Sequence, residues 1–210
     1  MPDPEPLSPL FEGQLNHSVE PVKRILAAAE RCLWRAGYGG MSVRNVAEEA
    51  GVSKSVLHYY FRSKDHLLLE VQIAVYNRLA KEVTDAVTQI EPGTARALQA
   101  FDALFETVRA MRLPVLSELH ARSITDPQLK AHARRLHDYM NGLVVDHIRD
   151  ILGPDVDRLP LPPQVAADIL IATVTGLGLQ AAVDESARLE AAFTGLRALL
   201  ALSLAGSGQE

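Results

Sequence analysis

The chain has 210 residues, of which 48% are hydrophobic and 22% charged, so it can bury a sizeable core and is not intrinsically disordered. Its formal net charge of −5 argues against indiscriminate binding to nucleic acid. One cysteine, Cys32, excludes an intrachain disulfide and favours a reducing compartment. The acidic start lacks the features of a signal peptide and no apolar stretch is long enough for a membrane span, so a cytoplasmic protein is expected.

The charge is unevenly distributed along the chain. Residues 1–20 carry four acidic and no basic residues, whereas residues 21–66 carry eight basic and four acidic ones. A short basic region of this kind allows local binding to a polyanion in an acidic chain. Residues 1–20 also contain four prolines and little periodicity, which predicts a mobile N-terminal arm.

Apolar residues recur at helical spacing from the end of this arm almost to the last residue, and strand signals are nearly absent, so an all-α fold is predicted. The first helix is expected over 22–35, and glycines follow it. Ser42 is a natural N-cap for a short helix over 43–50. Gly51 then supplies the positive φ of a sharp turn, and Ser53 caps a third helix.

Further helices are expected after these three. A fourth helix is expected from Ser63 to about residue 90, where the chain reads Glu-Pro-Gly. The remaining helices are expected over 94–111, 114–122, 127–152, 163–183 and 185–204. About nine helices are therefore predicted. A break in character near residue 66 divides the chain into the arm 1–20, a domain over 21–66 and a larger helical domain over 67–210.

Residues 43–60 have the pattern of a helix-turn-helix, in which the second helix presents its N-terminal residues to the major groove of DNA. The inward positions carry small or apolar residues, namely Val46, Ala47, Ala50, Val52, Leu57 and Tyr60. The exposed positions of the second helix carry hydrogen-bond donors suited to bases and phosphates. These predicted DNA-binding residues are Ser53, Lys54, Ser55, His58 and Tyr59. Ser42, Arg44 and Lys64 are placed to contact the flanking phosphates.

The stretch SVRNVAEEAGVSKSVLHYYFRSKDHLL, preceded by RILAAAERCLWRAGYGGM, resembles the DNA-binding domain of the TetR family of transcriptional regulators. The resemblance covers residues 22–68. It implies an all-helical homodimer that binds a palindromic DNA operator through an N-terminal three-helix domain, usually as a repressor released by a small-molecule ligand. It also implies that the eight residues just named stand at DNA-contacting positions, and that Tyr60 and Phe61 form a core pair.

Two positions depart from the family's usual pattern. Tyrosine commonly stands where this chain has His58, and a basic residue where it has Glu48, which we expect to face solvent. A histidine that contacts phosphate binds it more tightly when protonated, so operator affinity should rise as the pH falls through the neutral range. Binding assays across that range should show a flatter profile for His58→Gln; an unchanged profile would contradict the hypothesis.

The region from residue 67 onward matches the family in helix pattern only. Its last two helices are the expected dimer surface, because they carry apolar faces beyond the needs of one small domain. The predicted interface residues are Leu170, Val174, Leu177, Phe193, Leu196 and Leu200. Middle-helix residues are expected to line a cavity for an unidentified small-molecule effector, with ordinary core packing as the alternative. The predicted ligand-binding residues are Phe105, Met111, Tyr139 and Met140.

Other kinds of function are disfavoured. No enzyme is expected, because no nucleophile, base and orienting group form a recognisable motif and no phosphate-binding glycine loop is present. A metal site is not expected either, because the relevant histidines lack the i, i+4 spacing of helical chelation. They are His120, His132, His137 and His147. An interaction module that has lost DNA binding is disfavoured by the intact Lys54, Tyr59 and Lys64.

Overall fold

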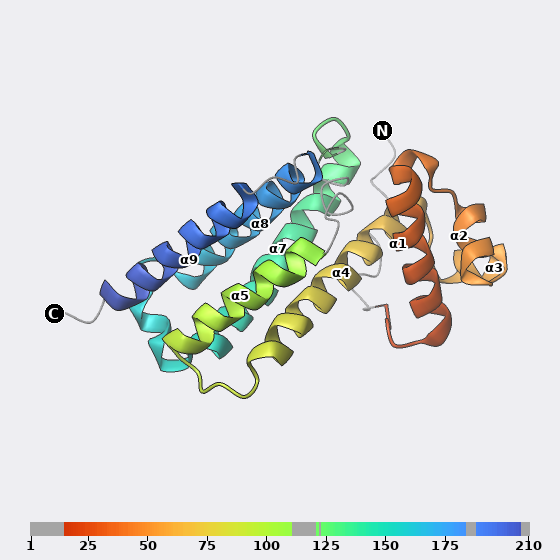
Figure 1. The fold of residues 1–210 in the computed structure, drawn as a ribbon. Helices are drawn as coiled ribbons and strands as arrows, with labels where there is room; N and C mark the ends of the chain where they lie inside the picture. Colours follow the sequence, from red (N-terminus) through yellow and green to blue (C-terminus); the bar gives the residue numbers. More distant parts are fainter. Residues whose placement is uncertain (1–14, 111–120, 122, 184–187, 207–210) are drawn as a thin grey trace. The chain divides into compact units, whose positions relative to one another are not determined.

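The computed structural model describes residues 15–110, 121, 123–183 and 188–206 (Figure 1). Within these ranges it contains eight α-helices, one 3-10 helix and no strand, which confirms the predicted all-α fold. The expected helix over 114–122 falls outside the described residues, apart from residue 121. Tertiary contacts divide the chain into two compact units, Met1–Ala74 and Val75–Glu210, and the division falls inside α4 (Lys64–Val87).

Three helices and the first part of α4 form the N-terminal unit. They are α1 (Glu20–Gly40), α2 (Val43–Ala50) and α3 (Lys54–Tyr60). α1 begins two residues earlier than expected, with Pro21 in its first turn, and Gly37 at φ 63° interrupts its regular backbone. Its apolar stripe packs on α2 and α3. Cys32 is 3% exposed and lies in this core.

Three serines cap the helices of this unit as the sequence predicts. The hydroxyl oxygen of Ser42 accepts the backbone N–H of Asn45 at 3.1 Å, and Ser53 and Ser63 act in the same way at the starts of α3 and α4. Between α2 and α3, Gly51 has φ 64° and ψ 38°, the left-handed conformation expected for the sharp turn. The caps and this turn fix the angle at which α3 leaves α2.

We expect Gly51→Ala to destabilise the N-terminal unit by about 1–2 kcal/mol, because left-handed backbone costs an L-residue this much. A Cβ at this position would lie 3.8 Å from the nearest atom, a guanidinium nitrogen of Arg24, so the cost is conformational and not steric. Urea unfolding measures the change. Gly39→Ala is the matched control, since Gly39 lacks a positive φ and has open space around it. Equal losses in the two variants would contradict this account.

An ionic cluster joins α1 to α2. Glu49 accepts hydrogen bonds from Arg31 Nε at 2.7 Å, from Arg35, and from Cys32 Sγ at 3.3 Å. The hydrogen bonds from Arg31, Arg35 and Cys32 hold the pKa of Glu49 at about 2. The sequence did not indicate this cluster, because its members lie on two helices and 14 to 18 residues apart.

Folding lowers the pKa of Glu49 from 4.5 to about 2, so its carboxylate stabilises the folded state above the unfolded pKa. This contribution to stability is lost as the pH falls from about 4.5 to about 2. We expect Glu49→Gln to unfold at lower urea concentration at neutral pH, and to lose less stability than the wild type between roughly pH 5 and 2. Glu48→Gln is the control, because Glu48 contacts only Arg44 within α2 among the ion pairs described. If Glu49→Gln lost as much stability as the wild type over this pH range, the ionic cluster would not be the source of the acid sensitivity.

A second polar cluster is buried near the start of α4. Glu70, 1% exposed, accepts a hydrogen bond from His17 Nε2 at 2.6 Å and faces His66 Nε2 at 3.4 Å. His66 Nδ1 accepts the backbone N–H of Arg62, so Nε2 carries the proton that faces Glu70. Burial raises the pKa of Glu70, but the contacts with His17 and His66 leave it below its ordinary value. Residues 1–14 of the predicted arm lie outside the described residues. His17, also in the predicted arm, is held against α4 by its hydrogen bond to Glu70.

The C-terminal unit is a layered bundle, built from the later part of α4 and four further helices (Figure 1). These are α5 (Thr94–Ala110), α7 (Pro127–Leu152), α8 (Pro163–Val183) and α9 (Arg188–Gly206), and the 3-10 helix η1 (Gly153–Arg158) follows α7. α5 contacts α7, α8 and α9, and α8 contacts α7 and α9. No helix in the described ranges combines the length and apolar character needed to cross a membrane.

Candidate nucleic-acid interface and ligand cavity

Two buried side chains anchor one face of α3, and the opposite face of the helix is exposed to solvent. Leu57 is 1% exposed and Phe61, just after the helix, is fully buried. The backbone N–H of Phe61 donates to the carbonyl of Leu57 at 2.8 Å and closes the helix. The predicted core pair is therefore only partly matched, since Phe61 is buried while Tyr60 is half-exposed.

The five residues predicted to read DNA from α3 are all exposed and share its outer surface. Tyr59 is 81% exposed. Its ring packs edge-on against the Tyr60 ring, with the two ring centroids 4.9 Å apart. Lys54, the first residue of the helix, has no ion-pair partner among the described residues. A free ammonium group and an exposed phenol on a rigid helix suit contact with phosphates and base edges.

The three flanking residues are engaged within the protein. The Ser42 oxygen caps α2, and Arg44 Nε donates to Glu48 at 2.8 Å on the exposed face of the same helix. Glu48 faces solvent, as expected for this departure from the family pattern. The ammonium of Lys64 lies 3.8 Å from the centre of the Tyr38 ring, and the Tyr38 hydroxyl donates to Asp65. Lys64 is thereby positioned at the N-terminus of α4.

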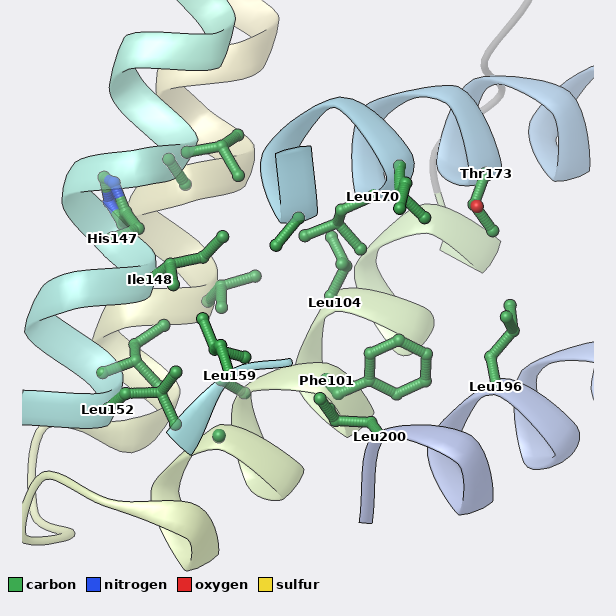
Figure 2. A pocket seen from close by; sticks show the side chains of 18 of the residues that line it. Phe101, Leu104, His147, Ile148, Leu152, Leu159, Leu170, Thr173, Leu196 and Leu200 are labelled. Carbon is green, nitrogen blue, oxygen red and sulfur yellow. The ribbon is translucent and has the colours of Figure 1, made fainter. Parts of the chain in front are cut away.

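The C-terminal unit contains a partly open cavity of about 330 Å³. Figure 2 shows side chains from α5, α7, α8 and α9 converging on it, and α4 completes the lining. Of the predicted ligand-binding residues, Met140 lines the cavity, whereas Met111 lies outside the described residues. Phe105 instead packs on Phe193 with ring centroids 4.1 Å apart, and the Tyr139 hydroxyl donates to Asn77 at 3.0 Å.

The residues predicted for a dimer interface mostly point into their own unit. Leu170, Leu196 and Leu200 line the cavity (Figure 2), and Val174 and Phe193 are 8% and 3% exposed. Leu177 is half-buried. The large apolar side chains that α8 and α9 leave exposed are different ones, namely Val165, Ile169, Leu179, Leu199 and Leu202. Because α8 is apolar on nearly all sides, periodicity could not tell its inner face from its outer one.

The histidines do not assemble a metal site in the part of the chain that the structure describes. His137 Nε2 pairs with Asp168 at 3.2 Å, and His147 Nδ1 contacts the Leu143 carbonyl at 2.7 Å and lines the cavity. His120 lies outside the described residues.

Comparison with known protein families identifies the class. Residues 25–71 match the model of bacterial regulatory proteins of the tetR family, and residues 93–205 match that of the BetI-type transcriptional repressor C-terminal region. The second match alone spans more than half of the chain. The chain belongs to the TetR family of transcriptional regulators, as its resemblance over residues 22–68 predicts.

Relatives of known name are regulators of the same kind. The HTH-type transcriptional regulator PksA of Bacillus subtilis (strain 168) is 29% identical over 176 residues, which span 81% of this chain and 82% of PksA. The HTH-type transcriptional regulator BetI of Brucella anthropi is 28% identical over 127 residues, 57% of this chain and 66% of BetI.

Solved structures share the fold. A TetR-family regulator from Rhodococcus sp. superposes with a TM-score of 0.71 at 21% identity, covering 88% of this chain and 98% of the other. The regulator FadR from Bacillus subtilis, solved in complex with stearoyl-CoA, gives a TM-score of 0.61 at 15% identity, covering 86% and 98%. At such low identity these similarities establish the fold alone.

Proposed function

We propose that this TetR-family regulator is a dimeric repressor, which binds a palindromic operator through α3 and is released by a small molecule in the C-terminal cavity. The observation that carries the proposal is the exposed set on α3, anchored beneath by Leu57 and Phe61. We assign DNA binding to residues 21–66, and ligand binding and dimerisation to residues 67–210. A DNA-binding regulator of this kind works in the cytoplasm, and no enzymatic role is proposed.

The test of DNA binding is a mobility shift with the DNA upstream of the chain's own gene, repeated at several salt concentrations. We expect a sequence-specific complex whose affinity falls steeply with salt, because binding releases counterions from phosphates. Unrelated DNA of equal length is the control. The absence of a specific shift with any fragment of the genome would refute the regulator as proposed.

Release by a ligand is supported by the position of the cavity along the chain. Its lining includes Tyr76, Leu79, Ala80 and Val83, all on α4. The same helix begins at Lys64, beside the candidate DNA contacts. A ligand that contacts α4 therefore acts on an element shared with the DNA-binding unit, through which binding at the two sites can be coupled. The stearoyl-CoA complex of the FadR neighbour is consistent with a small-molecule effector in this fold.

Dimerisation is supported by the apolar side chains that α8 and α9 expose. Leu179 is 44% exposed, Leu199 61% and Leu202 69%, and none of the three lines the cavity, so these two helices present several large apolar side chains to a partner. A second copy across a two-fold axis would cover them and match a palindromic operator. Sedimentation velocity should show a dimer for the wild type and a larger monomer fraction for Leu202→Asp. A monomeric wild type at micromolar concentration would contradict this part of the proposal.

A further inference from the structure

We infer that the cavity of the C-terminal unit takes an uncharged, largely apolar molecule that donates one hydrogen bond to His147. This inference rests on the proposed function in one respect, because it treats the cavity as the effector site. The chemistry of the ligand is argued from the side chains that line the cavity.

Among the described residues, the lining contains no charged partner for an ionic ligand. None of its described members is Asp, Glu, Lys or Arg, and the polar side chains among them are Tyr76, His147, Thr173 and Ser203. The other described lining residues are aliphatic except for Met140 and Phe101, and Phe101 is labelled in Figure 2. An ion moved from water into such surroundings without a counter-charge is strongly disfavoured. An ammonium or carboxylate group should therefore be rejected from the interior of the cavity.

His147 offers the lining a defined acceptor. Its Nδ1 lies 2.7 Å from the carbonyl oxygen of Leu143, one turn earlier on α7. A carbonyl oxygen can only accept, so Nδ1 carries the proton, and in the neutral ring Nε2 is then an acceptor. Since His147 lines the cavity, a hydroxyl or N–H group on an otherwise apolar molecule would satisfy that nitrogen. The cavity volume of about 330 Å³ suits a small molecule of this kind.

A matched set of probes that share a ten-carbon chain tests the inference by isothermal titration calorimetry at pH 8 without DNA. The probes are 1-decanol, its methyl ether, decanoate and decyltrimethylammonium, each below its aggregation concentration. We expect the alcohol to bind roughly two- to tenfold more tightly than the ether, the range for one neutral hydrogen bond. Both ions should bind at least about tenfold more weakly than the alcohol.

The variant His147→Leu should lose the preference for the alcohol and keep its affinity for the ether, which also shows that it is folded. Ser203→Ala is the matched control and should retain the preference. Tighter binding of either ion, a surviving alcohol preference in His147→Leu, or no binding of any probe would overturn the inference. Because these titrations contain no DNA, failure to bind an operator would refute the proposed repressor and leave the ligand chemistry standing.

Discussion

Lys54→Ala is expected to weaken operator binding by about 1–3 kcal/mol for each copy of α3, roughly 5- to 150-fold, and to make the salt dependence shallower. Lys54 stands exposed at the first residue of α3, and no acidic side chain in the described ranges pairs with its ammonium group. Its whole charge is therefore available to a phosphate or a guanine edge. Fluorescence anisotropy with a labelled operator at several salt concentrations measures both effects.

Lys130→Ala is the matched control for this experiment. Lys130 is exposed on α7, in the C-terminal unit, so its replacement removes the same charge far along the chain from α3. We expect a change in operator affinity of less than about twofold, since a single exposed charge outside the candidate DNA-binding residues is largely screened by salt. Equal losses for Lys54→Ala and Lys130→Ala would show that net charge, and not α3, determines the affinity.

Phe61→Ala is expected to destabilise the N-terminal unit by about 3–5 kcal/mol, because removing a fully buried aromatic ring leaves a cavity that the fold fills only in part. Phe61 has no exposed surface, and its ring lies 5.7 Å from that of His66. A loss of this size is a large share of the roughly 5–15 kcal/mol that stabilises most proteins. Urea unfolding monitored by circular dichroism measures it.

Tyr59→Ala separates stability from recognition. Tyr59 stands two residues before Phe61 but is 81% exposed, so its loss should change the unfolding free energy by no more than about 0.5 kcal/mol. Operator affinity should nevertheless fall, because the phenol belongs to the candidate reading surface. If Tyr59→Ala proved as destabilising as Phe61→Ala, the division of α3 into a supporting and a reading face would be wrong.

The sequence predicted the N-terminal unit closely because its signals are local. Serine caps, a glycine in left-handed backbone and short-range apolar spacing define α2 and α3. All of these signals lie within a few residues of the helices they define, so little depends on distant contacts. The interactions that it did not reveal are distant ones. Glu49 meets Arg31 across two helices, and Glu70 meets His17 across 53 residues.

The C-terminal unit was harder to read from sequence for a physical reason. α8 carries apolar residues on almost every side, because one side lines the cavity and others are exposed at 44% to 52%. Periodicity marks such residues as apolar without saying what they contact, so Leu170, Leu196 and Leu200 were predicted for an interface from a pattern that fits the cavity lining, where they lie, equally well. The ligand-binding candidates divide in the same way. Met140 lines the cavity, whereas Phe105 packs on Phe193 and Tyr139 donates a hydrogen bond to Asn77.

The claim that α3 reads DNA is tested most directly by crosslinking from the helix itself. A photoreactive phenylalanine derivative at position 55, in place of the exposed Ser55, should crosslink to bases at two symmetry-related places in the operator. The same derivative at position 130 on α7 should give no crosslink. Crosslinks from position 130 but none from position 55 would contradict the account.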